Sequence, residues 1–135
     1  MNVIVTDSGF SRDDFPGPWT LLHDLAPGTE ALDLPNHADP AALAGRLAGV
    51  GLVRIGFPAF SDGRGFTLAR RLRLQGYRGR LRAAGPLIAD QYAMLRRAGF
   101  DEVEIPDEIA ARQPEAQWLF RADWQHLDHR SRIVA

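Results

Sequence analysis

The fold is decided by residues 52–85, which read LVRIGFPAFSDGRGFTLARRLRLQGYRGRLRAAG. They open on the mostly apolar segment 52–57, pass through a glycine-rich turn, place Leu68 and Leu72 at helical spacing, and return to a strand-like segment at 80–83. This order is typical of a strand, a loop, a helix and a second strand. The stretch therefore predicts one complete crossover unit of a parallel sheet, with an unusual loop at its mouth.

The same unit recurs before and after this stretch. A period-two pattern that ends at Pro35 predicts a strand, and Asp39 before Pro40 is typical of the first turn of a helix. After Gly85 another helix is predicted to end at Gly99, because glycine favours the left-handed C-cap. The predicted strands are 3–5 (the start of a hairpin), 29–34, 52–57, 80–83 and 100–105, and the predicted helices are 40–50, 65–74, 86–98 and 107–112.

Charged residues alternate with apolar ones along the predicted strands. Strands that are buried on both faces read as continuous apolar runs, so the alternation indicates one polar sheet face. If all crossovers wind in one sense, the helices cover only the other face. We predict an α/β fold in which a parallel sheet of βα units carries its helices mainly on one face, like part of a (β/α) barrel. The alternating charges are Asp33, Arg54, Arg82, Glu102 and Glu104.

The composition excludes several classes of function. The 135 residues predict a single domain, 1–135, and a net charge of -1 predicts neither a nucleic-acid partner nor binding to an anionic membrane. All 16 basic residues are arginine, which excludes lysine Schiff bases and a P-loop lysine. With no cysteine, thiol catalysis and iron–sulfur clusters are excluded as well, and any redox role needs a bound flavin, a bound nicotinamide or a partner's redox centre. No particular cofactor is specified.

The first residues, MNVIVTDSGFSRDD, become acidic and polar too early for a signal peptide. No apolar run is long enough to span a bilayer. We therefore expect a cytoplasmic protein.

The loop after the strand at 52–57 is the best candidate for chemistry. Ligands of parallel α/β folds bind at the carboxyl ends of the strands, and two glycines, a helix start and a planar guanidinium group suit a phosphate, sulfate or carboxylate. The alternative is that the serine or aspartate merely caps the helix while the glycines permit its backbone geometry. The candidate anion-binding residues are Ser61, Asp62, Gly63, Arg64 and Gly65, together with Arg82.

Four further residues are expected at the same rim. Gly85 and Glu104 end neighbouring predicted strands, and Asp90 and Gln91 lie one turn inside the next helix. Arg82, Arg64 and Glu104 are expected to converge there, either as part of a site or as a structural set of ion pairs. No catalytic residue is identified, because no Ser–His–acid arrangement is present.

The segment 107–135 departs from this rhythm and is predicted to be a docking C-terminal extension. Its aromatic residues Trp118, Phe120 and Trp124 provide more aromatic surface than a solvent-exposed tail is expected to have. They are expected to dock either on this chain's own open sheet face or on a second subunit. The second alternative would make the protein a homo-oligomer. His126 and His129 have helical spacing but no third ligand, so no metal site is predicted.

Several separated blocks of the sequence resemble one bacterial family, domain of unknown function nine-three-four. The blocks are FSDGRGFTLARRLR, GYRGRLRAAGPLIADQ and RRAGFDEVEI, and ARQPEAQWLFRADW resembles the tail of some members. One departure is Arg80, where the family often has glutamate. The matching positions are Phe60, Asp62, Gly63, Arg64, Gly65, Ala69, Arg70, Leu81, Arg82, Ala83, Gly85, Asp90, Gln91, Gly99, Phe100 and Asp101.

The resemblance implies a place in sulfur metabolism. Members are encoded beside sulfite reductase, and some are labelled probable oxidoreductases. It implies an accessory or oxidoreductase-like protein of sulfite reduction that binds an anion such as sulfite, sulfate or a phosphorylated nucleotide. The alternative is a noncatalytic interaction subunit that docks sulfite reductase or another copy of itself.

Overall fold

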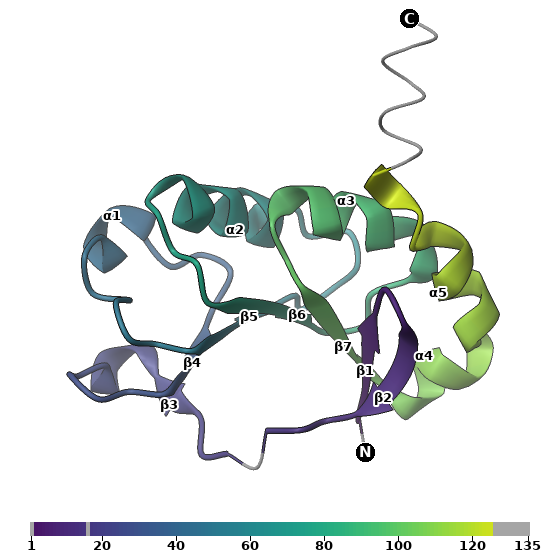
Figure 1. Ribbon diagram of the computed structural model, residues 1–135, viewed down its shortest axis with the longest axis horizontal. Coiled ribbons are helices and arrows are strands. Elements are labelled where there is room, and N and C mark those ends of the chain that lie inside the picture. Colours follow the sequence, from purple (N-terminus) through teal and green to yellow (C-terminus); the bar gives the residue numbers. More distant parts are fainter. Residues whose placement is uncertain (1, 16, 126–135) are drawn as a thin grey trace, which may run out of the picture.

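The computed structural model describes residues 2–15 and 17–125, which form one mixed seven-stranded sheet with helices along one face (Figure 1). The strand order is β2-β1-β7-β6-β5-β4-β3. The strands are β1 Asn2–Thr6, β2 Gly9–Arg12, β3 Thr20–Leu21, β4 Ala31–Leu34, β5 Leu52–Gly56, β6 Arg80–Ala84 and β7 Glu102–Pro106. The helices are α1 Pro40–Leu43, α2 Arg64–Leu74, α3 Tyr92–Ala98, α4 Asp107–Arg112 and α5 Glu115–Arg121, with 3-10 turns η1 Leu22–Asp24 and η2 Ala89–Gln91.

The central strands confirm the predicted α/β class. β4, β5, β6 and β7 lie side by side in chain order and pair in parallel. This sequential order keeps the crossover helices on one face. β1 then pairs antiparallel with both β7 and β2 in the hairpin expected from the first residues. The sheet ends at β2 on one side and β3 on the other, so it is an open sheet and not a closed barrel.

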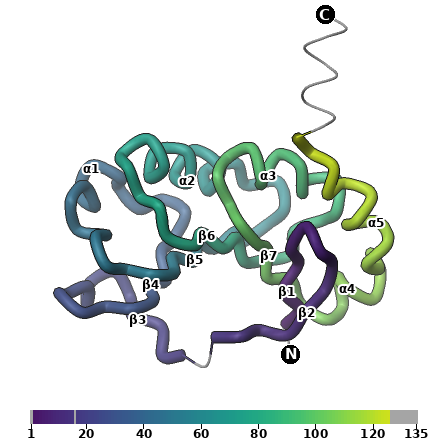
Figure 2. The backbone as a smooth tube through the Cα atoms, in the orientation of Figure 1, coloured from purple at the N-terminus to yellow at the C-terminus, as the bar shows by residue number. Residues whose placement is uncertain are grey.

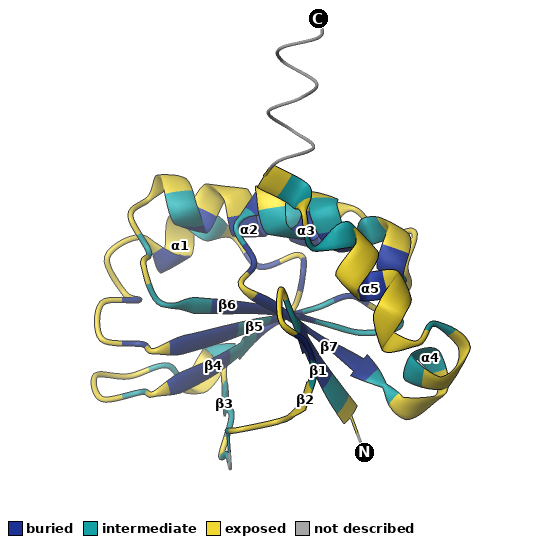
Figure 3. Cartoon of the chain, turned by 45° about the vertical axis from the view of Figure 1, so that its right-hand side comes forward, coloured by how far each residue is buried: buried dark blue, intermediate teal, exposed yellow. Residues whose placement is uncertain are grey.

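The core lies between the sheet and the helices. Val53 and Ile55 of β5 are fully buried in the same apolar cluster as Leu68 and Leu72 of α2. Each such side chain contributes about 1.5–3 kcal/mol by leaving water. Figure 3 shows the central strands largely buried and the outward surfaces of the helices exposed. Arg54, between Val53 and Ile55, points to the opposite face, as the alternating pattern predicts.

Two helix predictions were too long. The helix expected over 40–50 ends after one turn at Leu43, because Ala44 is extended and Gly45 has a φ of +77°. Its apolar residues Leu47 and Val50 are nevertheless buried, in loop backbone instead of helix. The helix expected over 86–98 begins only after η2, as α3.

The polar sheet face is covered by a strap, defined here as residues 13–15 and 17–19, which crosses it between β2 and β3 (Figures 1 and 2). Its side chains meet those of the sheet. Asp13 pairs with Arg82, Asp14 with Arg80, and the ring of Trp19 lies 4.0 Å from the guanidinium carbon of Arg54. The face predicted to be open is therefore covered by the chain itself.

The described part of the C-terminal segment docks on its own chain. Trp118 of α5 is buried, its indole donates to the Gln113 carbonyl oxygen, and its ring packs edge-on against Tyr92 of α3. The docking target is thus η2, α3 and the edge strand β2, where the Phe10 N–H donates to Glu115, and not the polar sheet face (Figure 1). Trp124 is half-buried beside Arg96, whereas Phe120 is 74% exposed.

Candidate anion site

The candidate loop joins β5 to α2 at the carboxyl end of the sheet. Gly63 occupies the N-cap position of α2, and Ser61 is exposed in the preceding turn. Asp62 accepts three hydrogen bonds from Arg64: from the backbone N–H at 3.1 Å, from Nε at 3.2 Å and from Nη2 at 2.8 Å. The carboxylate therefore holds both the guanidinium fork and one free amide of the first helical turn.

This pairing sets the protonation of both groups. Hydrogen bonds from the Arg64 side chain and backbone hold the pKa of Asp62 well below its ordinary value. The Asn36 amide acts in the same direction, although its Nδ2 makes no hydrogen bond among the described residues. The Arg64 pKa is raised in turn by Asp62. Both groups stay charged at neutral pH.

The two loop glycines have different roles. A Cβ on Gly65 would lie 2.3 Å from the Phe57 ring, so this glycine is required for α2 to pack on the end of β5. Gly63 has no atom within 4 Å of such a Cβ and has an ordinary φ of -88°. The structural alternative thus accounts for Gly65, while Gly63 leaves open space in front of the helix. Gly85, at φ +150°, lets its strand pass the Phe57 carbonyl oxygen closely.

A cleft of about 450 Å³ lies beside Arg64. One wall is α2, from which Arg64, Thr67 and Arg71 face the same side, since they are separated by three and seven residues. The other wall is the segment after β4, where Asn36 is only 5% exposed and His37 is exposed. The Arg64 side chain is 62% exposed. Two cations and a buried amide thus line one opening, together with the carboxylate of Asp39, which accepts from the Ala41 N–H at the start of α1.

The sequence reasoning missed three residues of this cleft. Asn36 stands two residues after the end of β4, so the rule that selected the loop after β5 applies equally to it. Thr67 and Arg71 were not identified as candidates. Their spacing from Arg64 was the signal that was available.

The other rim residues brace the loop. The Gln91 side chain donates to the Phe60 carbonyl oxygen at 2.6 Å and accepts from the Ile88 N–H. Asp90, its neighbour, is paired with Arg121 of α5 at 2.9 Å. Gln91 and Asp90 therefore tie the loop and α5 to η2, at a distance from the cleft along the rim.

Arg82 and Glu104 lie together, but not with Arg64. Both point from the middle of their strands to the polar face under the strap, where their side chains are 3.1 Å apart. Arg82 is fully buried and also contacts Glu102 at 2.6 Å and Asp13 at 3.0 Å. Burial alone would lower the pKa of Arg82, but its bonds to Asp13 and Glu102 raise it. This arrangement matches the structural reading, an ion-pair set that joins the sheet to its strap.

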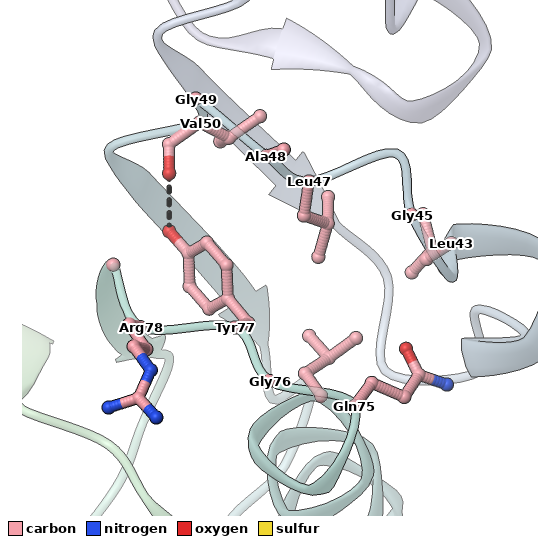
Figure 4. Close-up of a pocket in the computed structure, with 12 residues that line it drawn as sticks. Leu43, Gly45, Leu47, Ala48, Gly49, Val50, Gln75, Gly76, Tyr77 and Arg78 are labelled. Carbon is pink, nitrogen blue, oxygen red and sulfur yellow. Dashed lines mark hydrogen bonds between the residues drawn. The ribbon is translucent and has the colours of Figure 1, made fainter.

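A second hollow, of about 360 Å³, opens at the amino ends of the strands (Figure 4). Leu43, Leu47 and Leu72 line it, and Tyr77 closes one side by donating a hydrogen bond to the Val50 carbonyl oxygen at 2.9 Å. Burial raises the pKa of Tyr77 to about 12. The lining is apolar apart from Gln75, Arg78 and backbone groups, so this hollow lacks the converging charges of the cleft.

Within residues 2–15 and 17–125, no group of three or more metal-ligating side chains is placed to hold an ion. His126 and His129 lie outside the described residues. None of the described helices has the length and apolar character needed to cross a bilayer.

The family resemblance is confirmed by comparison. The model of a bacterial protein family of unknown function (DUF934) matches residues 31–130, well over half of the chain, including the candidate loop and both walls of the cleft. No curated protein and no solved structure matches the chain. The association with sulfite reduction stays a prediction.

Proposed function

The chain belongs to the bacterial protein family of unknown function DUF934, and we propose that this member is a cytoplasmic, anion-binding accessory protein of sulfite reduction in assimilatory sulfur metabolism. The anion site is the rim formed by Arg64 and the first turn of α2. The observation that carries the proposal is the exposed Arg64 guanidinium at the start of an 11-residue helix, with Arg71 on the same side of that helix.

Charge and geometry support binding at this place. The net charge of the chain is only -1, so attraction of an anion must come from a local cluster of cations. A planar guanidinium group binds an oxyanion through two parallel hydrogen bonds, and the helix start adds the positive end of a dipole. The site would hold and orient a sulfur or phosphorus oxyanion. Any electron transfer to it would use a bound flavin, a bound nicotinamide or the partner's centre, since the chain contains no cysteine.

Calorimetric titration with sulfite, sulfate and phosphate tests this proposal. We expect saturable binding by the wild type and its loss in Arg64→Gln. The matched control is Arg78→Gln, which removes an exposed arginine at the opposite end of the sheet and should bind like the wild type. Absence of binding by the folded wild type, or equal binding by Arg64→Gln, would overturn the site.

A second candidate function is the noncatalytic interaction subunit, favoured by exposed aromatic residues on either side of η2. Phe60 is 56% exposed and its carbonyl oxygen is bonded to Gln91, while Phe120 adjoins Arg121, which is bonded to Asp90. Sulfite reductase or a second copy of the chain would dock there. Among the three tail aromatics of the sequence prediction, Phe120 is the one whose ring is mostly exposed.

Co-purification with sulfite reductase and light scattering test this second candidate. The double variant Phe60→Ser, Phe120→Ser should lose the complex or the dimer, whereas Met94→Ser, an exposed change on the outer surface of α3, should not. Retention of both assemblies by the double variant would argue against docking at this place. Point variants are preferable to truncation after Pro114, because truncation would remove the buried Trp118 from the core.

A further inference from the structure

We infer that Asp62 is an internal competitor for the anion site, and that the site's ligand is a tetrahedral oxyanion with two negative charges, such as a phosphate or sulfate group. Such a group takes Arg64 from Asp62 and reaches the buried amide of Asn36 and the guanidinium of Arg71. The inference rests on the proposed function, which places the anion at Arg64. It adds the chemical class of the ligand and identifies the Asp62–Arg64 pair as the contact that the ligand must displace.

The first observation is that the Asp62 carboxylate already does what a ligand would do. Its two oxygens accept from Nε, Nη2 and the backbone N–H of Arg64 at 2.8 to 3.2 Å. This is the two-pronged geometry by which arginine binds an oxyanion. An incoming anion must therefore displace this carboxylate before it gains the fork.

The second observation is an unpartnered donor next to that pair. Asn36 is 95% buried, and its Nδ2 has no hydrogen-bond partner among the described residues. It lies close enough to Asp62 to favour the ionised carboxylate, but its Nδ2 is outside the geometry of a formed hydrogen bond. A buried donor without a partner is unfavourable. Asn36 also lines the cleft, so an additional ligand oxygen there would satisfy it.

The third observation is the second cation of the cleft. Arg71 stands two turns after Arg64 on the same side of α2, with the hydroxyl of Thr67 between them. A planar carboxylate has two oxygens in one direction, whereas a tetrahedral group presents three or four oxygens in different directions. Arg64 and Arg71 lie two turns apart on one wall and Asn36 lies on the other, so their donors approach from different directions and the tetrahedral group fits them better. Two guanidinium groups also match its two negative charges.

The volume of the cleft helps to distinguish a free oxyanion from the phosphate group of a larger molecule. At about 450 Å³ it exceeds the space that a bare sulfate or phosphate fills. A phosphate ester of a small organic molecule carries the same anionic group. The protein is therefore titrated with inorganic phosphate and sulfate, and separately with ribose 5-phosphate. Tighter binding of the ester would assign the remaining volume to its organic part.

The test is titration of the full chain with these ligands at constant ionic strength. Asp62→Asn removes the competing charge while keeping the side-chain shape, and it should bind phosphate about tenfold more tightly than the wild type or better. Asp90→Asn is the matched control, because it removes an exposed rim carboxylate that also pairs with an arginine, and it should change the affinity less than about threefold. In the Asp62→Asn background, Asn36→Ala and Arg71→Gln should each weaken phosphate binding about fivefold or more, and acetate should gain less than phosphate.

The outcomes separate the inference from the proposed function. If Asp62→Asn and the wild type bind phosphate with equal affinity, and Arg64→Gln does not bind, Asp62 does not compete with the anion. The anion site at Arg64 would still be supported by that result. Unchanged binding after both Asn36→Ala and Arg71→Gln, or an equal gain for acetate, would overturn the tetrahedral dianion. Absence of binding by the folded wild type would overturn the proposed function, and absence of binding by Asp62→Asn as well would overturn the inference too. Circular dichroism confirms folding in each case.

Discussion

Substitution of Arg82 by methionine tests the ion-pair set between the sheet and its strap. Arg82 is fully buried and lies 2.6 Å from Glu102, 3.1 Å from Glu104 and 3.0 Å from Asp13. Methionine keeps much of the volume but removes the charge. Glu102 and Glu104, which are 5% and 6% exposed, would then lose the arginine that lies between them, while Glu102 keeps Arg80 and Glu104 keeps Arg54 as partners. Because each carboxylate retains one arginine, we expect a loss of about 1.5–3 kcal/mol in the free energy of unfolding, below the range for a buried charge left without a partner.

Urea denaturation followed by tryptophan fluorescence measures this loss, since Trp19 stacks over Arg54 within the same set and reports on it. The matched control is Arg78→Met, an exposed arginine whose replacement should cost less than about 0.5 kcal/mol. A second variant, Arg82→Met with Glu102→Met, should recover part of the stability, because it removes the buried carboxylate that lost Arg82, and its other partner Arg80 is 42% exposed. A loss below about 1 kcal/mol in Arg82→Met would contradict a stabilising role of Arg82, because Arg80 and Arg54 would then suffice for the two glutamates.

Three further predictions concern packing and titration. Gly65→Ala should lower the free energy of unfolding, measured by urea denaturation, by about 1–3 kcal/mol, because the added Cβ meets the Phe57 ring. In a double-mutant cycle, Phe57→Leu should reduce this loss, and purely additive losses would contradict the contact. The contribution of Tyr77 to stability should be constant below the ordinary tyrosine pKa of 10.0 and fall as pH rises toward about 12, because burial raises the pKa of Tyr77 in the folded state. Tyrosinate absorbance that rises in the folded protein as early as in the unfolded protein would contradict this. Trp118→Ala should cost about 3–5 kcal/mol and Phe120→Ala less than about 1 kcal/mol by thermal denaturation, and similar losses in the two variants would contradict the docking of α5.

The elements that sequence alone predicted well are those with local signals. The crossover unit from β5 through α2 to β6 was confirmed within a residue or two, because apolar runs and helical spacing specify it without reference to the rest of the chain. The one-sided helix layer followed from alternating charges such as Arg54 and Arg82. The length of α1 was wrong because the buried positions of Leu47 and Val50 imitate helical spacing while Gly45 turns the backbone out of the helix.

The candidate site was predicted less completely, since its contacts join distant segments. Arg64 was identified from the loop, but its partner Asp62 was treated as one more ligand-binding residue and not as the group that fills the guanidinium fork. Arg82 was assigned to the rim, whereas the pleat directs it to the polar face. The strap that covers this face contains Pro–Gly–Pro and no periodic pattern, so only the tertiary structure reveals where it runs.

The central claim is that an oxyanion binds at Arg64 in the cleft beside α2. Solution NMR with the side-chain signals of the arginine Nε–H groups and the Asn36 amide measures this most directly during titration with phosphate. We expect saturable shifts of Arg64 Nε–H and Asn36 Nδ2 with one common affinity, and no comparable shift of Arg78. Unchanged Arg64 and Asn36 signals in the folded protein, or shifts equally large at Arg78, would contradict it.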